Sequence, residues 1–144
     1  HPYNSLSDIA MAMLLSTAFQ AQKYQELVTN ANRVVQVMDA QFSVQNRLWR
    51  AYSHFLIAES YYRLRMYPEA SRYYDEAAKH PAMADQARLY LAWSRYHEAK
   101  YADAIALAQQ VFGQGGVAEP YRASAYFLMA GSYFNQKNGS SAIR

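Results

Sequence analysis

The chain repeats itself at an interval of 34 residues. When Leu56–Ala70 is laid over Tyr90–Ala104 without a gap, five identical residues coincide. These pairs are Ala58 and Ala92, Ser60 and Ser94, Tyr62 and Tyr96, Tyr67 and Tyr101, and Ala70 and Ala104. A fixed period of this length is typical of a solenoid of helix pairs, in which each pair buries its apolar side by stacking on the next. We therefore expect an all-α solenoid of antiparallel helix pairs.

The composition favours helices and excludes several classes of protein. The chain is rich in alanine and tyrosine and poor in glycine and proline, which favours helix over strand. It has no cysteine, so a disulfide framework and a thiolate metal site are excluded. Its net charge of +3 comes without a dense basic run, which argues against nucleic-acid binding. The longest apolar stretch, Ile9–Phe19, is too short to span a bilayer, so we expect no membrane insertion.

Turn and helix-start signals divide the chain into three complete helix pairs and one incomplete pair, in a single repeat domain over residues 1–144. The expected units are a divergent repeat over 8–38, repeats over 48–81 and 85–113, and a partial repeat over 119–144. Connections are expected at Asp39–Asn46, at the glycines 113, 115 and 116, and at Asn138–Ser140, after which a last helix begins. Because that helix is cut short, we expect the chain to be a fragment of a longer protein.

Small and aromatic residues recur at fixed places in these units. Small residues twelve positions apart are Ala58 and Ala70, Ala92 and Ala104, and Ala130 and Ala142. Aromatic residues follow the first small residue at Tyr62, Tyr96 and Phe134, and they precede the second helix at Tyr24, Tyr67 and Tyr101. With Pro81 near the end of the best repeat, this pattern resembles the tetratricopeptide repeat. The resemblance implies a right-handed solenoid of about three and a half repeats, in which small residues let paired helices approach and aromatic residues fill the gaps between pairs.

The resemblance also implies where a partner binds, because the first helix of each tetratricopeptide pair lines a concave groove. The corresponding residues are Tyr52, Phe55, Glu59, Tyr62, Arg63, Gln86, Leu89, Trp93, Tyr96, His97 and Phe127, joined in the partial repeat by Ser124, Phe134 and Asn135. This set is aromatic, and Tyr, Trp and Arg dominate the binding energy of many interfaces. An aromatic groove of this kind is suited to an extended or helical segment of a protein partner.

Several of these residues have an alternative structural interpretation. The aromatic positions Tyr62, Tyr96 and Phe134 are also where the repeat needs packing side chains. Trp93 is different, because the repeat equivalents are Glu59 and Gly131, so packing does not require it. Arg63 and Glu59 are suited to a solvated pair on one helical turn. The lysines and asparagines with which some family members hold a carboxylate end are missing, so that activity is not expected.

The sequence offers no constellation for catalysis, a cofactor or a metal. The four histidines are scattered and do not have the spacing of a zinc-binding helix. The segment Gly113–Gly116 follows a predicted helix and lacks the Lys-Ser/Thr of a phosphate loop. We therefore predict that the chain is not an enzyme and has no cofactor.

The leading hypothesis is a protein-interaction scaffold that holds a peptide, helix or partner subunit. A second hypothesis is a self-associating structural subunit, a homo-oligomer within a large assembly. A third is a regulatory region of a larger enzyme, transporter or transcription factor. Composition leaves the compartment open, with a cytoplasmic location favoured over a periplasmic or secreted one.

Overall fold

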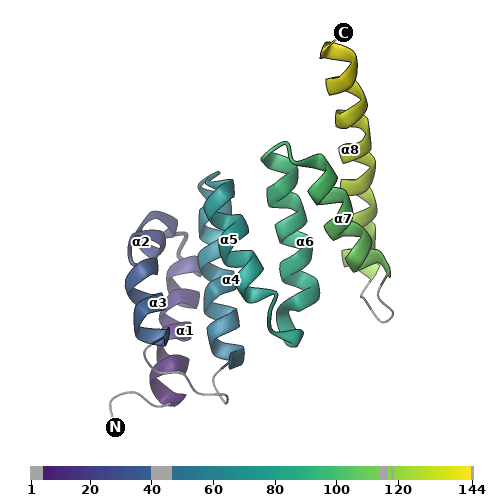
Figure 1. The fold of residues 1–144 in the computed structure, drawn as a ribbon. Coiled ribbons are helices and arrows are strands. Elements are labelled where there is room, and N and C mark those ends of the chain that lie inside the picture. Colours follow the sequence, from purple (N-terminus) through teal and green to yellow (C-terminus); the bar gives the residue numbers. More distant parts are fainter. Residues whose placement is uncertain (1–4, 40–46, 114–116, 118, 144) are drawn as a thin grey trace.

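The chain is a row of α-helices with short connections (Figure 1). The computed structural model describes residues 5–39, 47–113, 117 and 119–143, and within them there are eight helices and no strand. The helices are α1 (Ser5–Gln20), α2 (Tyr24–Thr29), α3 (Ala31–Asp39), α4 (Arg47–Arg63), α5 (Tyr67–Ala77), α6 (Pro81–His97), α7 (Tyr101–Gly113) and α8 (Glu119–Ile143). This confirms the all-α class and the sequential antiparallel packing expected from the sequence.

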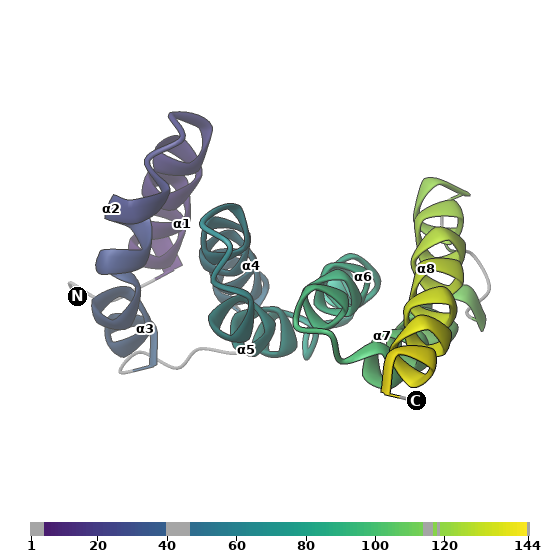
Figure 2. The same cartoon turned by 90° about the horizontal axis from the view of Figure 1, so that it is seen from above.

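The helices form two rows that curve together into a shallow arc. Figure 2 shows α1, α4, α6 and α8 on the inner side of the arc and α3, α5 and α7 on the outer side. Neighbouring helices of the inner row contact one another, and each helix also packs against its successor along the chain. We call the side formed by α1, α4, α6 and α8 the inner face, and the opposite side the outer face.

The same tight turn closes the first helix of each complete pair. Gln22, Arg65 and Ala99 all have a φ near +60° (60°, 61° and 62°), in the left-handed region. In each turn the next residue donates a backbone hydrogen bond five residues back, as Met66 does to Tyr61 and Lys100 to Arg95, at 2.9 Å. This is the geometry of a Schellman cap, which usually carries glycine. Sequence inspection missed it because no glycine marks the position.

The alanines of the repeat lie in the packed interior. Ala58, Ala70, Ala92 and Ala104 have no exposed surface, in agreement with a role in close helix approach. The core that contains Ala58 and Ala70 also holds large rings. Tyr74 of α5 lies between two rings of the inner row, with Phe55 at 5.7 Å and Tyr90 at 5.8 Å between ring centroids. Large rings thus fill the space that the alanines leave between successive pairs.

The second helix of the first pair is broken at Asn30, which separates α2 from α3. Two side chains at the break bond to backbone carbonyls four residues earlier: Thr29 Oγ1 donates to the Gln25 carbonyl at 2.7 Å, and Asn30 Nδ2 donates to the Glu26 carbonyl at 3.0 Å. Such bonds compete with the helical ladder and bend or interrupt it. Most of the predicted Asp39–Asn46 connection lies outside the described residues.

The predicted turn at Asn138–Ser140 is wrong, because α8 continues through it to Ile143. Ala130 and Ala142 therefore lie in one helix, about 18 Å apart along its axis, and cannot form the small-residue contact expected between two helices. Extending an existing helix is far easier than nucleating a new one, so one Asn-Gly pair does not end it. Of the predicted glycine connection, only Gly113 is described, and it ends α7.

Candidate functional site

An apolar hollow of about 320 Å³ opens where α1, α4 and the start of α6 meet on the inner face. Its lining includes Met13 and Ser16 of α1, Leu48, Trp49 and Tyr52 of α4, and Met83 of α6. Met13 is 63% exposed and Leu48 is 41% exposed, so their apolar side chains remain open to solvent. Tyr52 Oη lies 3.4 Å from Ser16 Oγ, which joins the two helices at this point. The hollow is thus suited to an apolar side chain of a partner.

Sequence reasoning identified only Tyr52 among these lining residues. Leu48 and Trp49 lie one helical turn before Tyr52, so the helical period could have indicated that all three share one side of α4. Met13 lies in the first helix pair, where the repeat pattern is weakest. Met83 lies near the start of α6, outside the positions that the resemblance assigns to the groove.

Aromatic side chains of α4 and α6 form a continuous cluster beyond the hollow. His97 Nε2 lies 3.0 Å from Tyr62 Oη, and the His97 ring stacks on Tyr67 with 4.5 Å between centroids. Trp93 meets Tyr96 edge to face at 5.6 Å. Burial raises the pKa of Tyr62 to about 12 and lowers the pKa of His97, which favours uncharged forms of both groups at neutral pH.

The polar atoms of this cluster tie α6 to α8. Trp93 Nε1 donates to Ser124 Oγ at 2.9 Å, and Asn135 Nδ2 donates to Tyr96 Oη at the same distance. Trp93 and Tyr96, which the sequence predicts to contact a partner, therefore also have a structural role, although each stays partly exposed. The sequence could not indicate the task of Trp93, because its partner Ser124 comes from the next unit.

Three of the predicted groove residues lie inside the packed structure. Phe55 contacts the rings of Tyr74 and Tyr90 edge to face, and Leu89 belongs to the core shared by α6, α7 and α8. Glu59 is buried as well, and its carboxylate accepts a hydrogen bond from Tyr74 Oη. The aromatic rings of α5 and α6 close over these positions and leave little of their surface for a partner.

Burial of the Glu59 carboxyl makes the stability of the fold depend on pH. Desolvation raises its pKa above the usual value of 4.5, and the Tyr74 hydrogen bond and the charge of Arg63 oppose this only in part. The folded state therefore holds this proton to higher pH than the unfolded state does. The stability that this group contributes is fully present below pH 4.5 and is lost as the pH rises through the folded-state pKa.

We expect Glu59→Gln to reduce this loss of stability. A neutral amide needs no proton to be buried, and its oxygen can still accept from Tyr74. The variant should therefore gain stability relative to wild type as the pH is raised from about 5 to about 7.5. Urea unfolding at both pH values measures this gain, and an equal difference between the two proteins at both values would contradict it.

The remaining predicted groove residues stay accessible to different degrees. The Arg63 guanidinium lies 5.9 Å from the Phe19 ring centroid and 6.0 Å from that of Tyr24, which places it over the rings of the first pair. Gln86 of α6 is half-buried. Phe127 is 74% exposed, the largest exposure among the big apolar side chains of the described residues.

Two pairs of exposed aromatic residues run along α8. Phe127 and Phe134 (64% exposed) are seven residues apart. Ser124 and Gly131, which lie three residues before Phe127 and Phe134 respectively, both face α6. Tyr126 and Tyr133 (66% and 52% exposed) form the second pair, and Tyr126 approaches Phe112 of α7 at 6.3 Å. The phenylalanines thus border the inner face and the tyrosines border the α7 side.

The described residues contain no group of three or more His, Cys, Asp or Glu side chains that could hold a metal ion. No helix in the described part of the chain is long and apolar enough to cross a membrane. No protein-family model matches this chain, and no curated protein matches its sequence.

Proposed function

We propose that this chain is a tetratricopeptide-like repeat module, a right-handed solenoid of about three and a half repeats, that binds a segment of another protein along its inner face. Its role is to hold a partner, not to catalyse a reaction. The repeat assignment is supported by the 34-residue sequence period and by Arg65 and Ala99, which adopt the same left-handed turn at that interval.

The exposure of Phe127 and Phe134 carries the functional proposal. A folded chain seldom leaves neighbouring large apolar side chains in water without a binding role. Together with the hollow at Leu48 and Trp49, these rings place apolar contact surface at both ends of the inner face. A partner segment with apolar side chains near both of its ends fits this pattern.

The matched aromatic pairs of α8 provide the test. Wild type, the double variant F127A/F134A and the double variant Y126A/Y133A are used as baits in extracts of the source cells. We expect a partner that is retained by the wild type and the tyrosine variant and lost with the phenylalanine variant. Because both pairs are exposed, neither variant should disturb folding. A partner lost only with the tyrosine variant would place recognition outside the inner face.

Self-association is the second candidate, and the exposed tyrosine pair of α8 favours it. Tyr126 and Tyr133 lie away from the α6 side of α8, so a second copy can contact them without occupying the inner face. Light scattering over a range of concentrations distinguishes the candidates. An oligomer that Y126A/Y133A dissociates supports self-association, and a concentration-independent monomer excludes it.

A further inference from the structure

Ala130 of α8 differs from the other alanines of the repeat. Its equivalents in α4 and α6, Ala58 and Ala92, have no exposed surface, whereas Ala130 is exposed. The sequence pattern expects Ala142 to cover it from a second helix, but both residues lie in α8. In the described part of the chain, no second helix covers this side of α8.

The register of α8 against α6 follows from residues that are buried in both helices. Ser94 and Ser132 have no exposed surface, and the same holds for Ala87 and Ala125. The members of each pair lie 38 residues apart, and Ala130 lies at the same interval from its equivalent in α6. The exposed side of α8 therefore corresponds to the side of α6 that packs against α7.

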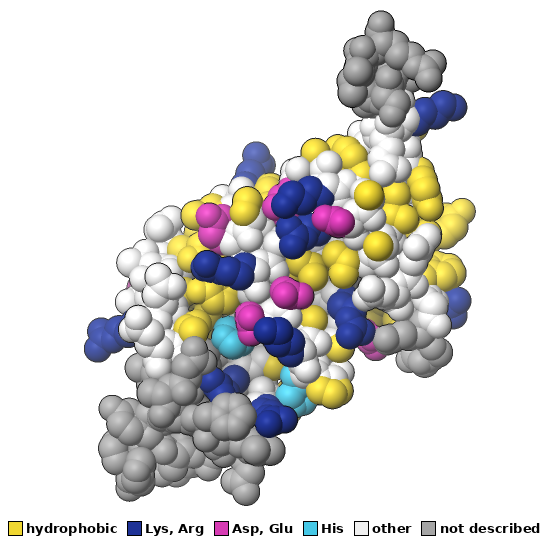
Figure 3. All heavy atoms as spheres, in the orientation of Figure 1, with side chains coloured by type: hydrophobic (Ala, Val, Ile, Leu, Met, Phe, Trp, Pro, Cys, Tyr) yellow, Lys and Arg dark blue, Asp and Glu magenta, His cyan; other side chains and the backbone are white. Residues whose placement is uncertain are grey.

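Four exposed rings flank Ala130 on this side of α8. Tyr126 and Phe127 lie one helical turn before it, and Tyr133 and Phe134 lie one turn after it. We call these five residues the α8 stripe. Figure 3 shows hydrophobic side chains at the surface over α7 and α8. A small residue between rings is also the pattern on the side of α4 that meets α5.

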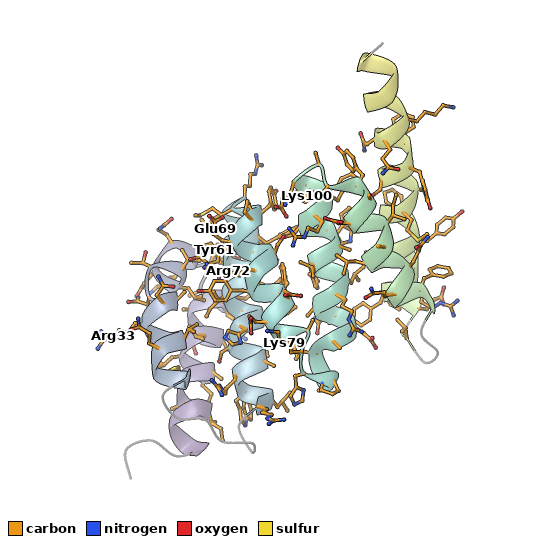
Figure 4. The ribbon with its side chains drawn as sticks, viewed as in Figure 1. Arg33, Tyr61, Glu69, Arg72, Lys79 and Lys100 are labelled. Carbon is orange, nitrogen blue, oxygen red and sulfur yellow. The ribbon has the colours of Figure 1, made fainter. Side chains whose placement is uncertain are left out.

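The positions of the α8 stripe are covered in α4 by the helix that follows it. Phe55 meets Tyr74 of α5 edge to face at 5.7 Å, at the place that Phe127 holds in α8. Tyr61, which is labelled in Figure 4, stacks on Tyr73 of α5 at 5.6 Å, at the place of the second tyrosine of the stripe. The interface between α4 and α5 thus continues, position by position, onto the α8 stripe.

We propose that the inner-face partner covers the α8 stripe with an amphipathic helix, which packs on α8 as α5 packs on α4 and places an alanine or glycine against Ala130. A small residue is needed there because the paired helices of the repeat approach one another at fully buried alanines such as Ala58 and Ala70. A helix laid on an apolar stripe is a common mode of recognition. This inference rests on the proposed function, because the helix belongs to the partner proposed there.

The phenylalanine side of the stripe matters most for such a helix. In α6, Leu89 and Tyr96 hold the places of the two phenylalanines. The places of the two tyrosines hold arginines instead, and α6 still packs against α7. The tyrosine rings are therefore not essential for the contact, and the tyrosine double variant should keep its partner in the capture experiment.

A synthetic copy of α5 tests the proposal, because α5 covers the matching side of α4. The peptide spans residues 66–79, has blocked ends and carries a fluorescent label. Fluorescence anisotropy measures its binding to the whole chain. We expect saturable binding that F127A/F134A abolishes, and absence of binding at about 0.5 mM chain would overturn the proposal.

Ala130→Leu is the decisive variant. It adds apolar surface, so nonspecific adhesion would become stronger, whereas the close approach of two helices would be blocked. We expect the α5 peptide to bind this variant about tenfold more weakly than wild type. Ala106→Leu adds the same side chain at an exposed alanine of α7 and should bind like wild type. Unchanged or tighter binding by Ala130→Leu would overturn the proposal.

The partner captured from the extract separates this inference from the proposed function. A partner that needs Phe127 and Phe134 but binds Ala130→Leu normally, and that the α5 peptide does not displace, would leave the proposed function standing and refute the helix. Peptide binding as expected, with no captured partner that depends on Leu48 or Phe127, would refute the proposed function and the assignment of the helix to that partner. A dimer that the peptide dissociates would assign the stripe to a second copy of the chain instead.

Discussion

Replacing Tyr74 with alanine is expected to destabilise the fold by about 3–5 kcal/mol, the usual cost of deleting a buried ring. The Tyr74 side chain is fully buried and contacts Phe55 and Tyr90, and its hydroxyl donates to Glu59. Its loss leaves a cavity between α4, α5 and α6 and removes the hydrogen bond from a buried carboxylate. A small domain is only about 5–15 kcal/mol stable, so this single change takes much of the total. Urea unfolding followed by circular dichroism measures it.

Two further variants separate the contributions of Tyr74. Tyr74→Phe keeps the ring and removes only the hydroxyl, and we expect a cost of about 1–3 kcal/mol because Glu59 loses its donor. Tyr126→Ala removes an exposed ring and should change stability by no more than about 0.5 kcal/mol. If Tyr74→Ala were as mild as Tyr126→Ala, α5 would not pack against the inner row as described.

Leu48→Asp is expected to weaken binding of the inner-face partner by at least about thirtyfold, the effect typical of a lost interface anchor. Leu48 lines the apolar hollow, and an aspartate there would have to lose its hydration when a partner side chain enters. The fold should tolerate the change, because Leu48 is partly exposed and a negative charge in the first turn of α4 is favourable. Calorimetry with the partner identified by capture measures the loss.

Met66→Asp is the matched control for this prediction. Met66 is also a partly exposed large apolar residue, but it lies in the turn between α4 and α5 and not in the hollow. We expect it to bind the partner like the wild type. Equal losses in both variants would show that the added charge acts through general electrostatics, and unchanged binding in Leu48→Asp would remove the hollow from the interface.

The interior of the fold was largely predictable from the sequence, because packing at a fixed period is a local property. Ala58 and Ala92 recur at the interval that helix pairs require, and both are buried. The end of the chain was not predictable in the same way. Asn138-Gly139 has the composition of a turn. A turn there would need a second helix that packs back on α8, and the sequence alone does not indicate that α8 continues instead.

The candidate site was less predictable, because exposure depends on neighbouring units. Glu59 and Trp93 occupy equivalent repeat positions, yet Glu59 is buried under Tyr74 and Trp93 bonds to Ser124 of α8. A repeat alignment assigns Glu59 and Trp93 to the same surface and does not indicate that Tyr74 and Ser124 bond to them. Phe127 was predicted at the groove and is highly exposed, whereas Leu48 and Trp49 were missed because their contacts come from α1 and α6.

Site-specific photo-crosslinking in the source cells tests the central claim most directly. A benzoylphenylalanine is placed at Leu48, at Phe127 or at Tyr126, one position for each protein. If a single partner lies along the inner face, the same adduct forms from Leu48 and Phe127 and is absent from Tyr126. An adduct that forms from Tyr126 but from neither of the other positions would contradict recognition through the inner face.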